Sequence, residues 1–351
     1  MQSAYSFRMA LLYETLYHKF RILLTKCSVF CIVKSENIFA GQHGVPCGEK
    51  EAIMDLKSMA TETRNPHTMD LDQMSALQIV TEMNREDANV PKAIAPVLPR
   101  IAQVVDWVVA AFAQGGRLFY MGAGTSGRLG VLDAAECPPT FGVPAELVVG
   151  LIAGGEHALL KAVEGAEDDR ALCRRDLQAH GLTAKDVVIG IAASGRTPYV
   201  LGGLDYAHSL GCKTAAIACN KGSEVGKAAE VALEAEVGPE VLTGSTRLKS
   251  GTAQKLILNM ISTASMVRSG KAYQNLMVDV MQTNEKLRVR AENIVIDATG
   301  VPREEARAAI DSAGGSVKLA ITMLLANIGA GEARTRLAAA GGHVRQAIAA
   351  K

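Results

Sequence analysis

The chain has 351 residues and a mass of 37.0 kDa, which is long enough for one large or two modest domains. Its residues are 48% hydrophobic and 21% charged, a balance that excludes a globally disordered protein. Lysine and arginine number 37, aspartate and glutamate number 36, and aromatic residues make up only 4%. A nucleic-acid-binding protein is therefore not expected, because it would need a basic excess or aromatic side chains for stacking on bases.

The seven cysteines and seven histidines are dispersed, with no Cys-x-x-Cys or His-x-x-x-His spacing. We therefore expect neither a disulfide framework nor a bound metal, and we expect a reducing, cytoplasmic location. No stretch reaches the roughly 20 uninterrupted apolar residues that cross a bilayer, so no membrane partner is expected.

Residues 1–58 mix basic and apolar residues and differ in patterning from the rest of the chain. The most apolar part, Leu11–Val33, is interrupted by charged side chains such as Lys19 and Arg21. We interpret this segment as an extension outside the fold, with a start codon placed too early or a targeting peptide as the alternatives.

The organised part begins with a polar turn at Thr61–Pro66 and a predicted helix over Met69–Met83. A second helical pattern covers Pro91–Gln114, and prolines restrict the regular helix to Ile101 onward. Short apolar runs then alternate with helical patterns, which predicts strands at residues 117–121, 146–152, 186–192, 213–218 and 231–237. Because such alternation is typical of parallel sheets covered on both faces, we predict an α/β fold with a doubly wound, five-stranded parallel sheet.

After Gly244 the pattern is helical to the end of the chain, with glycine breaks at Gly300, Gly314-Gly315 and Gly341-Gly342. The predicted organisation is an extension at 1–58, a helical segment at 59–107, the sheet domain at 108–271 and a helical region at 272–351.

The loop after the first predicted strand, Gly122–Arg128, contains a G-x-G-x-x-G pattern. A dinucleotide-binding loop would be followed about 20 residues later by an acidic residue, and Thr140–Ala145 has none. We predict instead a cup for a compact anion, formed by the free amides of the next helix with Gly124, Thr125 and Ser126.

A second small, hydroxyl-rich loop follows the third predicted strand and contains Ser194, Gly195, Arg196 and Thr197. Ligands of parallel sheets bind beyond the carboxyl ends of the strands, so both loops are expected to hold one phosphate group. No G-x-x-x-x-G-K-[ST] loop occurs, which favours a phosphorylated small molecule over a nucleotide. A third run, Thr243–Thr252, contains Arg247 and Lys249, which either neutralise a phosphate or only cap and solvate a helix.

Two glutamates are candidates for acid–base chemistry. Glu136 lies at the end of the helix that leaves the first anion loop, and Glu167 lies in the acidic turn Glu164–Asp169. Helix capping and solvation are the alternative for Glu167.

Residues 61–350 resemble the N-acetylmuramic acid 6-phosphate etherases, whose central part is a sugar isomerase (SIS) domain. The matching strings are Thr61–Pro66, Gly122–Arg128, Glu136–Thr140, Gly150–Glu156, Glu164–Asp168, Ala193–Tyr199, Thr243–Lys255, Asn275–Val280 and Thr283–Leu287.

This resemblance implies removal of the D-lactyl ether from N-acetylmuramic acid 6-phosphate, in a cytoplasmic homodimer that needs no metal or organic cofactor. It implies that the catalytic acids are Glu136 and Glu167 and that the active sites lie near the subunit interface. We expect Glu136 to act on the leaving lactate and on water, and Glu167 to abstract the C2 proton or to orient the sugar. A non-catalytic sugar-phosphate sensor, an aldose–ketose isomerase and, least favoured, a dinucleotide oxidoreductase are the alternatives.

Overall fold

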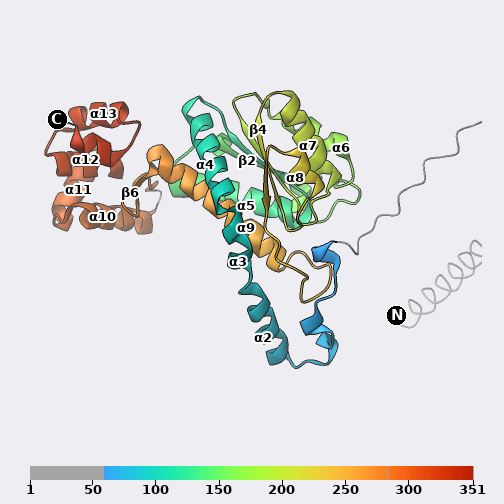
Figure 1. Ribbon diagram of the computed structural model, residues 1–351. Coiled ribbons are helices and arrows are strands. Elements are labelled where there is room, and N and C mark those ends of the chain that lie inside the picture. Colours follow the sequence, from blue (N-terminus) through green and yellow to red (C-terminus); the bar gives the residue numbers. More distant parts are fainter. Residues whose placement is uncertain (1–58, 283, 351) are drawn as a thin grey trace, which may run out of the picture. The chain divides into compact units, whose positions relative to one another are not determined.

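The computed structural model describes residues 59–282 and 284–350, so the extension expected at 1–58 lies outside the described residues. A five-stranded, all-parallel sheet with the strand order β2-β1-β3-β4-β5 forms the centre (Figure 1). Its strands are β1 (Leu118–Gly122), β2 (Val148–Ile152), β3 (Val187–Ile191), β4 (Lys213–Ala218) and β5 (Val231–Glu234). The predicted fold class is confirmed.

Helices cover both faces of this sheet, as its apolar strands require. Helices α4 (Leu98–Ala113), α5 (Gly124–Phe141) and α9 (Lys249–Met266) pack on one face. The other face is covered by α6 (Arg170–Ala179), α7 (Pro198–Ser209) and α8 (Glu224–Ala228).

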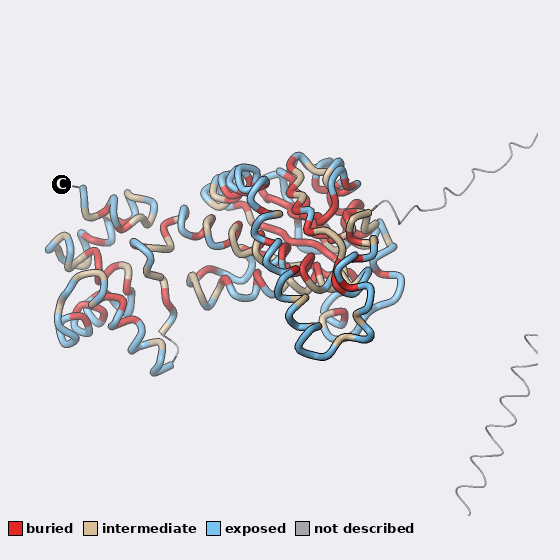
Figure 2. The backbone as a smooth tube through the Cα atoms, turned by 60° about the horizontal axis from the view of Figure 1, so that its bottom comes forward, coloured by how far each residue is buried: buried red, intermediate tan, exposed pale blue. Residues whose placement is uncertain are grey.

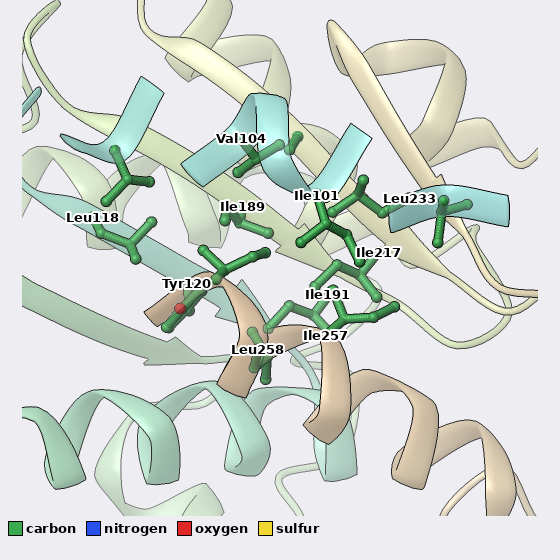
Figure 3. Close-up of a cluster of buried hydrophobic side chains, with 14 of the residues drawn as sticks. Ile101, Val104, Leu118, Tyr120, Ile189, Ile191, Ile217, Leu233, Ile257 and Leu258 are labelled. Carbon is green, nitrogen blue, oxygen red and sulfur yellow. The ribbon is translucent and has the colours of Figure 1, made fainter. Parts of the chain in front are cut away.

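Side chains of each strand alternate between the two cores. In β1, Tyr120 joins the core under α4 and α9, and Phe119 joins the core under α6 and α7. Figure 3 shows the first core, where Ile101 of α4 and Ile257 of α9 lie near strand residues such as Ile191. The strands and the inner faces of these helices are accordingly buried (Figure 2).

The N-terminal helices begin where local signals place them, which differs from the predicted bounds. A short 3-10 turn at Leu71–Gln73 precedes α2 (Ala76–Asp87), whose start is fixed by a capping box between Ser75 and Gln78. The helix predicted from Met69 is therefore wrong in its start.

Prolines shape the next part of the chain. They occupy the first turns of α3 (Val90–Ile94), of the 3-10 turn Ala95–Val97 and of α4, where a missing N–H costs nothing. The stretch Ala76–Ala113 is long and apolar enough to cross a membrane, but the apolar face of α4 within it packs on the sheet.

Helix α5 continues to Phe141, five residues beyond its predicted end, with Pro138 and Pro139 inside it. Proline donates no backbone hydrogen bond, so a proline pair inside a helix is unusual. The prolines fall in the last turns, and Gly142, with a φ of 60°, closes the helix by donating its N–H to the Pro138 carbonyl (2.9 Å).

The C-terminal helices are α10 (Glu285–Thr299), α11 (Arg303–Ser312), α12 (Val317–Ala326), α13 (Ala330–Ala339) and α14 (Val344–Ala349). They share a hydrophobic core of their own, and Gly300 ends α10 in a left-handed conformation, as the predicted glycine break requires. A small antiparallel pair, β6 (Ala272–Tyr273) and β7 (Leu276–Met277), precedes them and was not predicted.

The structure corrects the prediction for Lys249. Instead of facing a ligand loop, this side chain is 2% exposed and its ammonium pairs with the Glu86 carboxylate of α2. The other Glu86 oxygen lies 3.1 Å from His67 Nδ1. The Glu240 carboxylate accepts hydrogen bonds from the backbone amides of Lys249 (3.2 Å) and Ser250 (2.9 Å), so the N-terminus of α9 is already occupied.

This buried pair ties α2 to α9. Burial alone would raise the pKa of Glu86, but the hydrogen bonds from Lys249 and His67 and the charge of Lys249 outweigh it and lower the pKa. The pair therefore stabilises the fold at neutral pH, and that stabilisation is lost as the pH falls through the lowered pKa.

We predict that Glu86→Gln lowers the free energy of unfolding at pH 7 by about 3–5 kcal/mol, because it leaves the Lys249 ammonium buried without a counter-charge. Denaturant unfolding measures this loss. The difference from the parent protein should shrink as the pH is lowered below the ordinary glutamate pKa of 4.5, where Glu86 becomes protonated.

The control is Glu82→Gln on the same helix, which removes a more exposed pair with Arg85 and should change stability by less than about 1 kcal/mol. Equal stability of Glu86→Gln and the parent protein at pH 7 would contradict the account.

Candidate active site

The loops that carry the predicted site lie at one edge of the sheet, because parallel strands end on the same side. Residue Gly122 of β1 is opposite Ile152 of β2 and Ile191 of β3. The loops after β2, β1, β3 and β4 therefore follow one another along that edge, where ligands of such sheets bind.

Helix α5 begins directly at this edge because Gly122 and Gly127 approach each other closely. A Cβ atom added to Gly127 would lie 2.6 Å from the Gly122 carbonyl oxygen, and one added to Gly122 would lie 2.8 Å from the Gly127 nitrogen. Only glycine permits this approach. As a result, α5 begins two residues after the end of β1.

The N-terminus of α5 has the geometry of an anion site. Its N-cap residue is Ala123, which has no side-chain oxygen, and the first intrahelical bond runs from Gly127 N to the Ala123 carbonyl (3.2 Å). The amides of Gly124, Thr125 and Ser126 precede that bond and have no intrahelical acceptor. Three free amides at the positive end of a helix favour a bound phosphate.

The Ser126 hydroxyl is engaged inside the protein. Ser126 is buried, and its Oγ donates to Gln254 Oε1 of α9 at 3.0 Å. Its backbone amide remains part of the N-terminus of α5. Thr125 is only partly buried and lies near Gly251 of α9.

The loop after β3 is shaped by Gly195. Its φ of +78° and the 2.4 Å between an added Cβ and Ser223 Cβ both require glycine. Thr197 is the N-cap of α7, and its hydroxyl does not cap the helix. Arg196 turns toward α8, where its Nε lies 3.3 Å from Glu224 Oε1.

A cavity of about 320 Å³ lies between the loops after β1 and β2, and Gly124, Arg128 and Glu167 are in its wall. The exposed Glu167 is held at this place through its main chain, because its carbonyl accepts a hydrogen bond from Tyr199 N (3.0 Å) in the first turn of α7. The structure thus brings Glu167 to the first predicted phosphate loop and joins its main chain to the start of α7.

A second cavity, of about 400 Å³, lies between the loops after β3 and β4, and Ser194 and Arg196 line it. Asn220 also lines it and exchanges hydrogen bonds with the buried Thr61, whose N–H donates to Asn220 Oδ1 (3.3 Å). Two residues of the predicted polar turn Thr61–Pro66, Thr61 and Asn65, are therefore buried at this edge, whereas Arg64 and Pro66 are exposed.

Glu136 lies apart from these cavities. It is exposed on α5, twelve positions after Gly124, which corresponds to about 18 Å along the helix axis. It lines neither the 320 Å³ nor the 400 Å³ cavity. A single chain, as far as residues 59–282 and 284–350 describe it, does not bring Glu136 and Glu167 into one cavity.

Below Glu136, α5 is joined to α9 by a buried polar contact. Asp133 Oδ1 accepts hydrogen bonds from Asn259 Nδ2 (3.0 Å) and Ser262 Oγ (3.1 Å). Burial raises the pKa of Asp133, although these two donors act in the opposite direction. Burial likewise raises the pKa of the Cys137 thiol to about 12, which makes it a poor nucleophile.

Sequence reasoning missed several residues that hold this edge together, among them Glu86, Asn220, Glu240 and Gln254. Glu86, Asn220 and Gln254 have partners more than 100 residues away, so spacing gave no signal for them, whereas Glu240 caps a helix that begins nine residues later. Arg128 was noticed only as a member of its loop, although an arginine in an anion loop could have been singled out.

Comparison with known proteins gives close relatives over most of the chain. This chain is 62% identical over 295 residues to the N-acetylmuramic acid 6-phosphate etherase of Pectobacterium atrosepticum. The match covers 84% of this chain and 97% of that protein. The corresponding proteins of Serratia proteamaculans and Rhizobium rhizogenes are 61% and 57% identical, cover 84% and 86% of this chain, and are each 99% covered.

Two family models also match: the glucokinase regulatory protein N-terminal SIS domain at residues 100–208 and the SIS domain at residues 175–264. Among solved structures, a phosphoheptose isomerase from Francisella tularensis is 18% identical with a TM-score of 0.44, covering 55% of this chain and 100% of that one. The identity to the curated relatives, and the share of their length that is matched, show that this chain belongs to the N-acetylmuramic acid 6-phosphate etherase family.

Proposed function

We propose that this protein cleaves the D-lactyl ether of N-acetylmuramic acid 6-phosphate with water, giving N-acetylglucosamine 6-phosphate and D-lactate. The names of its relatives support the substrate. The observation that carries the proposal is that the Glu167 carboxyl group and the open N-terminus of α5 belong to one cavity. A phosphate on the α5 amides would hold the sugar within reach of a general base.

The chemistry requires two proton-transfer groups. Ring opening exposes an aldehyde at C1, which acidifies the C2 proton. A carboxylate removes that proton, the C3–O bond breaks, and a carboxylic acid protonates the departing lactate oxygen. Water then adds at C3 of the unsaturated aldehyde and a proton returns to C2, so one water is consumed in all.

Glu167 takes the C2 proton in this proposal, and Glu136 acts on the lactate oxygen and then on the water. Support for two separate roles comes from their positions, because Glu167 lines the cavity and Glu136 is exposed outside it. A homodimer would supply Glu136 to the site of the neighbouring subunit.

The phosphate is held by the residues of the two loops at the sheet edge. These are Gly124, Thr125 and Ser126 at the N-terminus of α5, and Ser194, Gly195, Arg196 and Thr197 after β3. We further propose that the enzyme works in the cytoplasm without metal or organic cofactor. The four described cysteines are buried free thiols, which suits a reducing compartment.

We expect incubation with N-acetylmuramic acid 6-phosphate to release D-lactate, and expect Glu136→Gln and Glu167→Gln to slow release by at least about 100-fold, because each removes an acid–base group. Solvent deuterium exchange at C2 separates the roles. Glu167→Gln should abolish exchange and Glu136→Gln should retain it. The reverse pattern would exchange the two roles, and sugar-phosphate binding without lactate release would indicate a sensor instead.

Mixing the two inactive variants tests whether the site is shared between subunits. In a mixed dimer of Glu136→Gln and Glu167→Gln chains, one of the two shared sites has both glutamates. Random mixing should therefore restore about a quarter of the parent activity. The activity of co-refolded variants measures this, with each variant refolded alone as the control. No recovery would place both glutamates in one chain's site.

A further inference from the structure

The cavity that contains Glu167 has one basic side chain in its wall, Arg128 of α5. The other charged side chains that line it are the carboxylates of Glu164 and Glu167, and the remaining lining residues are small or apolar. Any anionic part of a ligand in this cavity would therefore meet a cation only at Arg128.

The guanidinium of Arg128 is fixed by two main-chain contacts. Its Nε donates to the Leu159 carbonyl (2.8 Å), and its Nη2 donates to the Ala158 carbonyl (2.7 Å), both in the 3-10 turn Glu156–Leu159 after β2. These bonds use the Nε–Nη2 edge of the planar group. They hold the side chain in one orientation at the wall of the cavity.

The other edge of the guanidinium carries two parallel N–H groups, one on Nη1 and one on Nη2. Within residues 59–282 and 284–350, no acceptor is bonded to this edge and no carboxylate lies within 4.0 Å of the Arg128 guanidinium nitrogens. A fork of this kind matches a carboxylate, which can accept both hydrogen bonds at once.

We propose that Arg128 binds the carboxylate of the D-lactyl group, so that this cavity is the lactyl subsite of the enzyme. The inference rests on the proposed function, in which the substrate carries two anionic groups. The phosphate is held by helix amides and hydroxyls, and the second anion requires the cation. Arg128 offsets the repulsion from Glu164 and Glu167 and distinguishes the lactyl ether from a sugar that lacks it.

A purely structural role for Arg128, holding the Glu156–Leu159 turn, is the competing explanation. The two roles differ in which ligands they affect. A structural role would weaken every ligand of the cavity, whereas a carboxylate subsite affects only ligands that carry the lactyl carboxylate.

The test compares N-acetylmuramic acid 6-phosphate with its lactyl carboxamide, which has the same shape without the charge. We expect kcat/KM of the parent enzyme to favour the acid by about 10- to 100-fold, as for charge-assisted hydrogen bonds. Arg128→Gln should reduce this ratio to about one, and Arg128→Lys, which keeps the charge and loses the fork, should give an intermediate ratio. Comparing variants cancels any intrinsic difference in reactivity between the two substrates.

The product N-acetylglucosamine 6-phosphate lacks the lactyl group and serves as the binding control. Its Kd, measured by calorimetry, should change by less than about twofold in Arg128→Gln. The product has no lactyl carboxylate, so it makes no hydrogen bond to Arg128 that the substitution could remove. Arg117→Gln is a control variant remote from the cavity, because Arg117 donates to the carbonyls of His180 and Gly181 and pairs with Asp186 (2.9 Å) at the opposite end of β1. It should retain the preference for the acid.

Equal weakening of acid, amide and product in Arg128→Gln would overturn the proposal in favour of the structural role. An acid-to-carboxamide ratio of kcat/KM near one in the parent enzyme would also overturn the proposal. This outcome needs no variant, so it holds even if Arg128→Gln fails to fold. In both cases D-lactate is released by the parent protein. If the parent protein released none, the proposed function itself would fail, and the lactyl subsite with it.

Discussion

The contact between Gly122 and Gly127 is the constraint on which the site depends. Because neither residue has a side chain, β1 passes directly into α5, and the first amides of that helix reach the edge of the sheet. The same helix then positions Arg128 in the cavity wall and Glu136 farther along its exposed face. A side chain at either glycine would displace α5 and separate these groups from the loops after β2 and β3.

Several helices begin at this edge, and the fold leaves the N-terminus of α5 open. The Glu240 carboxylate occupies the N-terminus of α9, and the Glu167 carbonyl accepts from the first turn of α7. The N-cap residue of α5 is Ala123, whose side chain cannot accept a hydrogen bond from the first amides of the helix. Amides with partial charge thus provide an anion site without a cluster of cations, which explains how a near-neutral chain can bind a phosphate.

Local patterns were sufficient to predict the sheet, because strands such as β3 and β4 are short apolar runs between glycine-rich loops. They were insufficient where a distant partner decides the outcome. Lys249 looked like a phosphate ligand in its loop, and only its pairing with Glu86, 163 residues away, places it in the core. The end of α5 was also misplaced, because the helix continues through Pro138 and Pro139 to Phe141.

We propose that the sugar phosphate binds between the α5 N-terminus and Glu167. A crystal structure with N-acetylglucosamine 6-phosphate tests it most directly. We expect phosphate oxygens about 3 Å from the amides of Thr125 and Ser126, with C2 facing Glu167 and with Glu136 of the partner subunit near C3. A phosphate bound away from the α5 amides, with C2 remote from Glu167, would contradict this proposal.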